Sequence, residues 1–503
     1  MLSSWSAMGK FDVIIIGGGL GGLLCGYVLS KEGSSVCIIE KNHKPGGSLQ
    51  TFGRKGCVFN TGLNYTESLD DGQILNQYFR YFGLMDMVSF KRLDADGFER
   101  ISFNDGQYRF AMGQSDFVET LSAAFPGERA GLEEYTRKIS DICTAIPLYS
   151  LQEEQLSLIG NPDLSAGAAD YISSVIGSPR LRNILAGNNL LYAGHENKTP
   201  LFIHALINHS FIESAWRVMD GSHQIVNKLI DNIKSAGGTV MLGSKAVKLT
   251  GDKNSIDGVE LQNGDYIEGK HFIAAIHPDQ ILDMVDPGMI RKAYSSRIRG
   301  LDNTMGMFTV YVVFKKDSFP YMNHNFYHYN QNNVWIASDY RREEWPQNYL
   351  FMNTATSGSQ IFAESGSIIT YMDYSEVAQW EHTFTGDRGD DYNAFKQARA
   401  EKLLDAVEKQ FPGIRNSIAA WYTSTPLTWR DYTGTREGSA YGILKDHNRP
   451  LESMIMPRTK IQNLFLTGQN TNVHGILGVT ISSIVTCAEL IDIRNLVRKI
   501  RKA

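Results

Sequence analysis

A glycine-rich turn near the start of the chain constrains the fold more than any other feature. The β-branched run Phe11–Ile16 leads into Gly17–Gly22, and Leu20–Glu32 then repeats apolar residues at helical spacing. A second apolar run, Val36–Ile39, follows after Gly33. Strand, glycine turn, helix and strand in this order predict a parallel β-α-β unit with a right-handed crossover. The sequence therefore predicts an α/β protein built on a doubly wound, Rossmann-type sheet.

Three of these glycines, Gly17, Gly19 and Gly22, have the spacing G-x-G-x-x-G. In such a turn the first glycine permits the tight bend, the second leaves room for a pyrophosphate, and the third lets helix and strand pack closely. Glu40 stands at the end of the second predicted strand, where a carboxylate accepts hydrogen bonds from the ribose hydroxyls of an unphosphorylated adenosine. The pattern indicates a dinucleotide site but does not choose between FAD and NAD.

A second glycine turn follows directly after Glu40. The segment Lys44–Phe52 carries Gly46 and Gly47, whose backbone can pass close to a pyrophosphate or a flavin because neither residue has a side chain. A plain NAD domain does not need this second turn. We therefore predict non-covalently bound FAD as the cofactor. The chain has no second dinucleotide fingerprint, so NAD(P)H is expected only as a transient electron donor.

The rest of the chain alternates between pieces of this domain and pieces of a second one. Mostly helices are expected over 70–210, including Asp116–Ala124 with Asp116 as its N-cap, and Gly131–Ile146. Further expected elements are a helix within Val218–Ser235, strands within Gly238–Leu249, a hairpin over Gly258–Glu268, strands at His271–Ile276, Met307–Phe314, Trp335–Ser338, Ile368–Met372 and Asn463–Gly468, and helices at Tyr392–Gln410 and Ile476–Arg498. We expect an FAD-binding domain at 1–69, 216–285 and 456–503, interleaved with a mixed sheet-plus-helix substrate domain at 70–215 and 286–455.

Composition and charge are those of a folded protein that does not attract polyanions. Of the 503 residues, 42% are hydrophobic and 20% are charged, and the formal net charge of −5 makes nucleic acid an unexpected partner. Five cysteines without a CxxC pair or a metal-ligand spacing suit a reducing compartment. No apolar stretch is long enough to span a bilayer, and residues 1–10 lack an export signal. We expect a cytoplasmic protein without a metal site.

Several longer motifs extend these observations along the chain. They are GGGLGG at 17–22, EKNHKPGGSLQTF at 40–52, GCVFNTGLNY at 56–65, TPLTWRDY at 425–432, GSAYG at 438–442 and NLFLTGQNTNVHGILGV at 463–479. With these motifs the chain resembles the phytoene desaturase and carotenoid isomerase superfamily of flavoproteins, and most closely its retinol saturase branch. The resemblance runs nearly to the C-terminus and implies chemistry at carbon–carbon bonds of polyenes.

The resemblance also implies roles for individual residues. The ADP half of FAD would be held by Gly17, Gly19, Gly22 and Glu40, with the diphosphate near Gly46 and Gly47. The backbone of Val247 would pair with adenine, and Gly468 would begin the turn that meets the ribityl chain. Further cofactor contacts are implied for Leu20, Lys41, Ser48, Gln469, Asn470, Gly478 and Val479.

This chain departs from the family pattern at four positions. Many relatives carry Arg, Asp, His and an acidic residue where this chain has, respectively, Ser48, Asn60, Asn64 and Asn470. Asn470 can still accept a hydrogen bond from a ribityl hydroxyl through its amide oxygen. A helix beginning near Ile476 would direct the partial positive charge of its N-terminus at anionic reduced flavin, so the loop Gly475–Gly478 is predicted to tune the cofactor.

Four residues are candidate proton donors, although each residue type is also common in structural, half-buried positions. They are Tyr65, Tyr432, Tyr441 and His474. A further cluster runs from His324 to Tyr329, where strand alternation would place Phe326 and His328 on one face and Tyr327 and Tyr329 on the other. An ordinary sheet surface accounts for that cluster.

The expected activity is hydride transfer between FAD and a carbon–carbon bond of an apolar polyene or isoprenoid, with a nearby acid and a pocket that excludes water. Retinoid-like saturation is the leading case, while desaturation and isomerisation stay open because the sequence does not fix direction. A flavin amine oxidase, which would carry an aromatic cage, is a second reading. A non-enzymatic prenyl-lipid carrier is a third, against which the intact segments Gly17–Glu40 and Asn463–Val479 argue.

The C-terminal segment mixes apolar and basic residues. Its apolar members are Ile491, Ile493, Leu496, Val497 and Ile500, and its basic members are Arg494, Arg498, Lys499, Arg501 and Lys502. Cations suit the dipole at a helix C-terminus, and a basic amphipathic end can also rest on anionic lipid. Because an apolar substrate resides in membranes, peripheral membrane contact is expected.

Overall fold

Strands from the beginning, middle and end of the chain form the first sheet. The computed structural model describes residues 7–153, 162–338, 340–358 and 361–503. The sheet contains β1 (Ala7–Ile16), β2 (Val36–Ile39), β10 (Thr239–Met241), β11 (Ala246–Gly251), β12 (Ile256–Leu261), β13 (Tyr266–Ala274) and β19 (Leu464–Leu466). Its order is β10-β2-β1-β13-β12-β11, with β19 paired to β13. Strand β1 pairs in parallel with both β2 and β13, as the predicted β-α-β unit requires.

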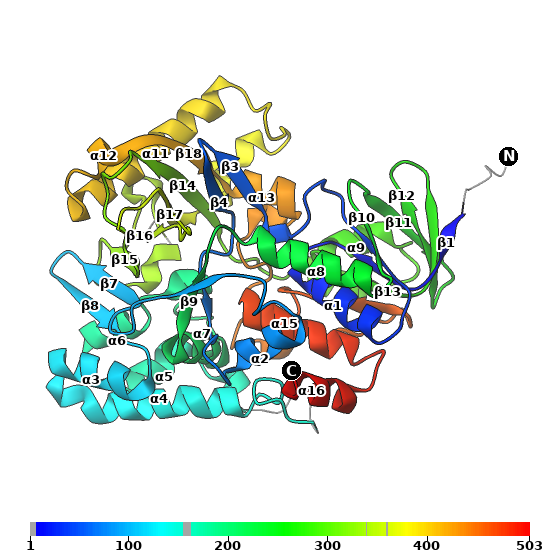
Figure 1. Ribbon diagram of the computed structural model, residues 1–503, viewed down its shortest axis with the longest axis horizontal. Coiled ribbons are helices and arrows are strands. Elements are labelled where there is room, and N and C mark those ends of the chain that lie inside the picture. Colours follow the sequence, from blue (N-terminus) through cyan, green and yellow to red (C-terminus); the bar gives the residue numbers. More distant parts are fainter. Residues whose placement is uncertain (1–6, 154–161, 339, 359–360) are drawn as a thin grey trace.

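Helix α1 (Leu20–Lys31) contacts β1, β2 and two further helices, α8 (His223–Ser235) and α15 (Gly475–Cys487). Every residue from Leu20 to Ser30 is buried, which explains why α1 is apolar on all sides. In Figure 1 the blue α1 and the red α15 lie side by side at the centre of the molecule. The two ends of the chain therefore meet beside the glycine turn that follows β1.

The second sheet is mostly antiparallel and contains seven strands. In spatial order they are β18 (Ile418–Ser424), β14 (Gly306–Phe314), β17 (Ser365–Met372), β16 (Asn348–Asn353), β15 (Asn325–Tyr329), β7 (Glu99–Phe103) and β8 (Gly106–Phe110). Only the β15–β7 pair of this sheet is parallel. Smaller sheets pair β3 (Thr51–Arg54) with β4 (Cys57–Asn60), and β9 (Ala215–Val218) with β5 (Thr66–Glu67) and β6 (Phe90–Arg92). The antiparallel sheet expected between 304 and 374 is confirmed.

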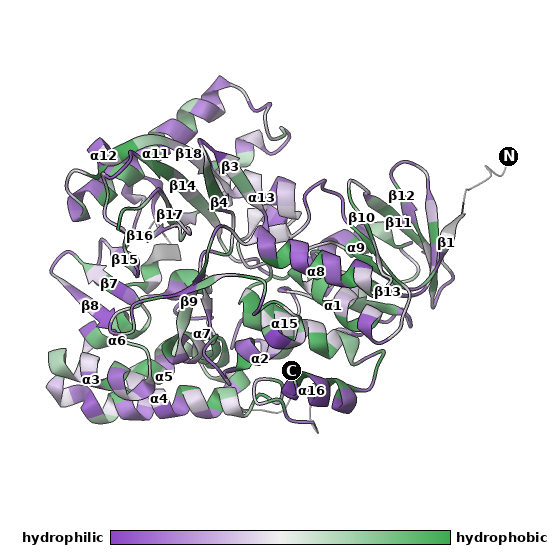
Figure 2. Ribbon diagram, in the orientation of Figure 1, coloured by the Kyte–Doolittle hydropathy of each residue, from purple (hydrophilic) through white to green (hydrophobic). Residues whose placement is uncertain are grey.

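The remaining helices pack around the two sheets. They include α2 (Ile74–Tyr81), α3 (Gln114–Ala124), α4 (Arg129–Thr144), α5 (Ala168–Val175), α6 (Pro179–Leu185), α7 (Leu201–Glu213), α9 (Pro278–Met284), α10 (Lys292–Arg299), α11 (Asp390–Gln410), α12 (Ile414–Ser417), α13 (Pro426–Thr433) and α14 (Pro450–Ser453). Helix α7 packs on α4 and α5 and is buried along most of its length. In Figure 2 the outer helix α4 carries much hydrophilic purple, while hydrophobic green concentrates on interior strands.

Two local expectations were wrong. The segment 70–210 is built mostly from helices, as predicted, but the Asn104-Asp105 turn also joins β7 and β8, which extend the second sheet. Trp335–Ser338 forms a 3-10 turn instead of a strand, since the side chain of Asn333 accepts a hydrogen bond from the backbone N–H of Trp335. Helix α3 begins one residue after Gly113, so Asp116 lies in its first turn and is not its N-cap.

Two helices follow the last strand where one long helix was expected. Helix α15 ends at Cys487, and α16 (Ile493–Arg501) begins after Asp492, whose carboxylate accepts a hydrogen bond from the backbone N–H of Arg494. An aspartate in this role favours a new helix start over a helix interior. Helix α16 contacts α2, and Leu496, Val497 and Ile500 are buried. The apolar side of the C-terminal segment therefore faces the protein.

Candidate active site

The glycine turn after β1 has the geometry that its spacing predicts. Gly17 has a φ of 107°, and its N–H donates to the carbonyl oxygen of Ile39 at 2.8 Å, which ties the turn to β2. A Cβ on Gly22 would lie 2.0 Å from the carbonyl oxygen of Gly17, so only glycine lets α1 start this close to β1. A Cβ on Gly19 would meet nothing nearer than 3.9 Å. Packing therefore requires the first and third glycines, whereas the second leaves space for a ligand.

The second glycine turn lies directly against the first. The N–H of Gly46 donates to the carbonyl oxygen of Gly18 at 2.7 Å, and Gly46 and Gly47 have φ values of 115° and 56°. A Cβ on Gly47 would lie 3.3 Å from the Cα of Gly19. The two turns, Gly17–Gly22 and Gly46–Ser48, form one concave backbone surface, which we call the glycine cradle.

Glu40 is buried beneath this cradle. Its Oε2 accepts a hydrogen bond from the N–H of Gly18 at 2.7 Å, and its Oε1 accepts one from the N–H of Asn42 at 2.8 Å. The ammonium group of Lys41 instead donates to the carbonyl oxygen of Asp431 at 3.1 Å. Val247 lies where the register between β11 and β12 shifts, so its backbone is skipped by that pairing. Contacts of a cofactor with Glu40 and Val247 stay predictions.

The C-terminal loop reaches the cradle through its own glycines. A Cβ on Gly21 would lie 3.1 Å from the Cα of Gly468, while a Cβ on Gly468 or Gly475 would meet nothing within 4 Å. Lys445 is buried beneath this loop and donates to the carbonyl oxygens of Ser453, Asn470 and Thr471 at 2.8–2.9 Å. Burial lowers the pKa of Lys445 to about 7. This lysine fixes the backbone between β19 and α15.

Two side chains near the start of α15 accept hydrogen bonds from the backbone. The amide oxygen of Asn470 accepts a hydrogen bond from the N–H of Ile443 at 3.1 Å, so the structure gives that oxygen a backbone partner. The carboxylate of Glu67 is buried and accepts a hydrogen bond from the N–H of Leu477, in the first turn of α15, at 3.2 Å. Burial raises the pKa of Glu67. A buried carboxyl group therefore lies at the helix N-terminus that the sequence predicts to tune the flavin.

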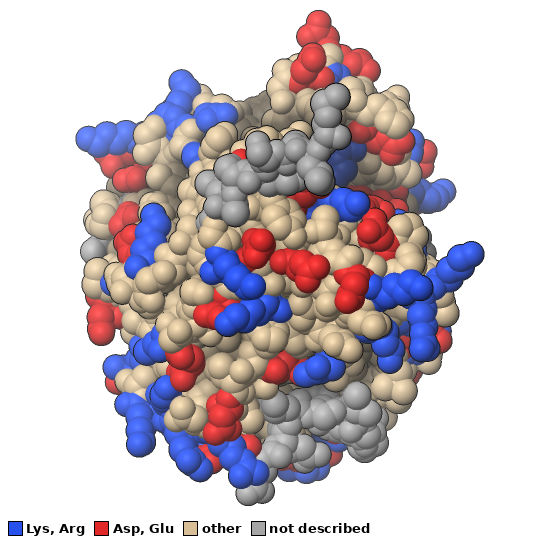
Figure 3. Space-filling view, turned by 90° about the vertical axis from the view of Figure 1, so that its right-hand side faces the viewer, with Lys and Arg blue, Asp and Glu red and all other residues tan. Residues whose placement is uncertain are grey.

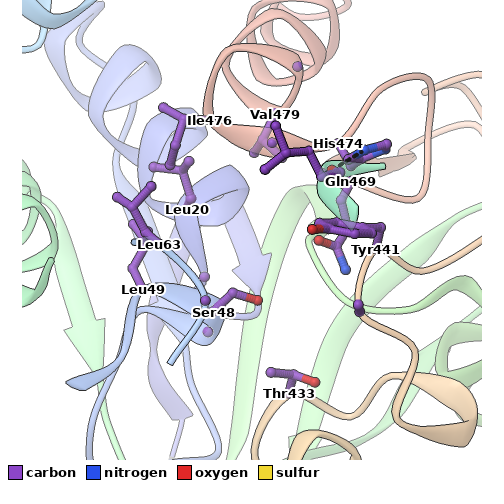
Figure 4. Close-up of a pocket in the computed structure, with 18 of the residues that line it drawn as sticks. Leu20, Ser48, Leu49, Leu63, Thr433, Tyr441, Gln469, His474, Ile476 and Val479 are labelled. Carbon is purple, nitrogen blue, oxygen red and sulfur yellow. Dashed lines mark hydrogen bonds between the residues drawn. The ribbon is translucent and has the colours of Figure 1, made fainter. Parts of the chain in front are cut away.

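One cavity joins the glycine cradle to the second sheet. Its polar end is lined by the backbone of the cradle and by Gly468–Asn470, together with Gly478 and Val479 of α15. Its other walls are apolar and come from α7, β14, β16 and β17, through Leu206, Ile207, Phe211, Met307, Leu350, Met352 and Ile369. Figure 4 shows Leu20, Leu63 and Ile476 on one side of this space, facing Gln469 and Tyr441. The cavity can hold a dinucleotide at one end and an apolar molecule at the other.

The structure brings three of the four candidate proton donors to this cavity. Tyr65, Tyr441 and His474 line it, and the rings of Tyr441 and His474 lie against each other with centroids 4.6 Å apart. Burial lowers the pKa of His474 to about 4, so its imidazole is neutral at pH 7. Tyr432 is 46% exposed and lines a neighbouring cavity beside Lys44, so the structure separates it from the other candidates.

Comparison with known proteins agrees with this geometry. Residues 20–491 match the family model described as flavin containing amine oxidoreductase. The chain belongs to this family.

Individual relatives match over most of the chain. The all-trans-retinol 13,14-reductase of Danio rerio is 24% identical over 96% of this chain and 86% of that protein. The chloroplastic prolycopene isomerase of Daucus carota is 22% identical over 95% of this chain and 79% of that protein. A solved variant of putrescine oxidase has a TM-score of 0.63 at 15% identity, covering 95% of this chain and 98% of the other, which shows a shared fold.

This flavin oxidoreductase is therefore an enzyme of the class that the sequence predicted, and the carrier reading is set aside. Its residues fit a flavin cofactor. The open spaces above Gly19, Gly468 and Gly475, together with the N-termini of α1 and α15, form a surface of backbone N–H groups suited to phosphate and to an anionic ring. Which residues contact the cofactor stays a prediction.

Sequence reasoning missed a polar cluster behind Tyr65 in this flavin oxidoreductase. The phenol of Tyr65 donates to Oε1 of Glu99 at 2.6 Å, and its oxygen lies 2.5 Å from the phenol oxygen of Tyr327. Asn188 donates to Oε2 of Glu99 at 3.2 Å.

Glu99 lies on β7 and Tyr327 on β15, which is an interior strand of the second sheet and not an exposed sheet surface. The predicted alternation holds, because Tyr327 and Tyr329 share one hydrophobic cluster while Phe326 lies in another. No local sequence signal marks Glu99.

Proposed function

We propose that this protein binds FAD non-covalently and exchanges hydride with a carbon–carbon double or single bond of an apolar polyene or related isoprenoid. The observation that carries the proposal is the cavity that continues from the glycine cradle into walls made of Leu206, Phe211, Leu350 and Ile369. Such walls exclude water and leave few polar groups to bind a hydrophilic substrate. Bound flavin would supply two-electron chemistry where the polar end of the cavity meets its apolar end.

The residues of the chain would divide the remaining tasks. The N-terminus of α1 and the glycine cradle would bind the diphosphate, and Glu40 would accept hydrogen bonds from the ribose hydroxyls. The apolar strands β14, β16 and β17 would hold the substrate chain against the open face of the flavin. Lys445 would keep the loop Gly468–Asn470 in place beside the ribityl chain.

The names of the relatives support this substrate class. One is a retinol reductase and another a prolycopene isomerase, and both share nearly the full length of this chain. Saturation of a retinoid-like polyene is therefore the leading case. Desaturation is the same chemistry in reverse, and isomerisation would follow from reversible steps. The direction depends on the electron partner, for which NAD(P)H acting as a transient donor is our first candidate.

Amine oxidation is the second candidate function, because the family description names amines and the solved putrescine oxidase variant shares the fold. The adjacent rings of Tyr441 and His474 in the cavity wall are the observation that favours it. A C–N substrate would be oxidised with release of hydrogen peroxide in air. Peroxide formation with a panel of primary amines therefore separates the two functions.

The test begins with the purified protein. We expect it to be yellow and to release FAD into the supernatant on heat denaturation, because no residue is assigned to a covalent link. Chemically reduced protein, kept free of oxygen, should then be reoxidised by a conjugated polyene alcohol, with a product two mass units heavier. A flavin-to-protein ratio near zero would contradict the cofactor assignment. Reoxidation by amines and by no retinoid, carotenoid or unsaturated lipid would favour the second function.

We further propose a cytoplasmic enzyme that contacts anionic membranes peripherally to collect its substrate. All five cysteines are free, which suits a reducing compartment. In the described parts of the chain, no helix is both long and apolar enough to cross a bilayer. On the face drawn in Figure 3, basic and acidic side chains are interspersed, in keeping with the expectation of no nucleic-acid partner.

A further inference from the structure

The candidate proton donors in the cavity wall differ in the group to which each of them is hydrogen-bonded. The phenol of Tyr441 donates to the carbonyl oxygen of Leu190 at 2.8 Å, and Nε2 of His474 lies 3.2 Å from the carbonyl oxygen of Leu191. A backbone carbonyl can orient a side chain but cannot supply or take up a proton. Tyr65 is bonded to a carboxyl group, Glu99, which can do both.

Glu99 is withdrawn from solvent and lies one side chain away from the cavity. Glu99 is 0% exposed. Of the cluster formed by Tyr65, Glu99 and Tyr327, only Tyr65 is part of the cavity wall. Among the residues that the structure describes, the titratable groups that face Glu99 are four phenols, those of Tyr65, Tyr192, Tyr327 and Tyr329. Burial raises the pKa of each phenol, so all four stay neutral near pH 7. Burial also raises the pKa of Glu99, to about 7.

We propose that Tyr65 is the catalytic acid–base residue of this enzyme and that Glu99 is the positioning residue that exchanges protons with it. This inference rests on the proposed function. When Glu99 is protonated, its hydroxyl donates to the oxygen of Tyr65, which frees the phenolic proton to point into the cavity. When Glu99 is ionised, Tyr65 donates to the carboxylate. The direction of one hydrogen bond thus switches the phenol between acid and base.

The proton balance is complete for either direction of the reaction. In saturation, Tyr65 would give its phenolic proton to one alkene carbon, which forms a C–H bond, while bound reduced flavin would supply hydride to the other carbon. The O–H proton of Glu99 moves to the oxygen of Tyr65 and leaves a carboxylate. Before the next turnover, Tyr65 takes up one proton from water in the emptied cavity and passes its own proton to that carboxylate. In desaturation, Tyr65 would take the proton from one carbon and pass its own proton to the carboxylate of Glu99, while the neighbouring carbon would lose its hydride to bound oxidised flavin.

The first experiment measures single-turnover reoxidation of the reduced protein by a polyene alcohol, without oxygen, between pH 5 and 9. For the unsubstituted protein we expect a rate that falls above pH 7, because saturation needs protonated Glu99. Tyr65→Phe should lower the rate about 10²- to 10⁴-fold, the usual contribution of a general acid. Glu99→Gln keeps the shape and hydrogen bonding of the side chain but should flatten the pH profile. Tyr78→Phe is the matched control, since this buried phenol bonds to the carbonyl oxygen of Leu148 outside the cavity wall.

The same reaction in D₂O gives a stereochemical readout. We expect one solvent deuteron on a single face of the product for the unsubstituted protein, and loss of this preference in Tyr65→Phe. Equal rates and equal face selectivity in the unsubstituted protein and Tyr65→Phe would overturn the inference while leaving the proposed function intact. Failure of every alkene to reoxidise the unsubstituted protein would instead overturn the proposed function.

The second experiment does not depend on turnover. Infrared difference spectra of the purified protein, taken across a pH titration, report protonation of buried carboxyl groups, and the band absent from Glu99→Gln identifies Glu99. We expect its midpoint near pH 7, and a shifted midpoint in Tyr65→Phe because the phenol bonds to both forms of the carboxyl group. A midpoint near 4.5, or one that Tyr65→Phe leaves unchanged, would overturn the link between the two residues.

Discussion

The carboxylate of Glu40 accepts a hydrogen bond from the backbone N–H of Gly18 at 2.7 Å, which joins the end of β2 to the glycine turn after β1. A single side chain thus holds the turn in shape. Sequence reasoning predicted only a contact between Glu40 and the ribose of the cofactor, and that contact stays a prediction. Replacing Glu40 therefore tests both the turn and the predicted cofactor site.

Glu40→Ala is expected to weaken FAD binding by about 1–3 kcal/mol, because ribose hydroxyls lose a charged acceptor and the N–H of Gly18 loses its partner. The dissociation constant is measured by flavin fluorescence on protein stripped of its cofactor. Glu268→Ala, which removes an exposed glutamate of the same sheet, is the control and should bind FAD normally. Full flavin occupancy of Glu40→Ala on dilution would contradict the ribose assignment.

Gly22→Ala is expected to destabilise the protein by about 1–3 kcal/mol or more, as overpacked positions do. The new methyl group would lie 2.0 Å from the carbonyl oxygen of Gly17, a contact that α1 can relieve only by moving away from β1. Denaturant unfolding monitored by circular dichroism measures the free energy of unfolding. Gly127→Ala adds the same methyl group where nothing lies within 4 Å, and should change stability little. Equal stability of the two variants would show that α1 tolerates a shift.

The stability of the protein should depend on the protonation of Glu99. Burial raises its pKa in the folded protein to about 7 from an unfolded value of 4.5, so the folded state binds more protons between these two pH values. The stabilisation by protonated Glu99 is fully present below pH 4.5 and is lost as pH rises through 7. Relative to Glu99→Gln, the free energy of unfolding should fall by about 3 kcal/mol across this window. Parallel curves for the two proteins would contradict the raised pKa.

Membrane contact by the C-terminal helix should be electrostatic, because Leu496, Val497 and Ile500 of α16 are buried. Arg498 and Arg501 pair with Glu153, and Lys499 pairs with Glu32, whereas Arg494 and Lys502 have no ion pair among the described residues. We expect sedimentation with anionic vesicles at low salt and its loss at high salt, at about 1 kcal/mol per basic residue.

Replacing Arg494 and Lys502 together by Gln should reduce this sedimentation without exposing the core. Truncation after Asp492 is a less specific test, because it would uncover residues of α2 that α16 covers. Replacing the exposed Lys253 and Lys316 by Gln gives a control with the same change of charge elsewhere on the surface. Equal binding by both double variants would move the membrane contact away from α16.

Local chemistry in the sequence determined the first β-α-β unit, the spacing of Gly17, Gly19 and Gly22, and the second turn at Gly46 and Gly47. These features follow from backbone conformation and close packing between residues that are near in sequence. Such local interactions can be predicted from the spacing of glycines and apolar residues. Several strands of the second sheet and the alternation of side chains along β15 could be predicted from the sequence for the same reason.

Only the tertiary structure brought Glu67 to the start of α15 and Glu99 behind Tyr65. Strand β7, which carries Glu99, pairs with β15 more than 200 residues later in the chain. The same long-range packing separated Tyr432 from the cavity and covered the apolar side of α16. Burial and neighbouring groups decide whether a carboxyl or a phenol can exchange a proton, and both depend on contacts between segments that the sequence does not place side by side.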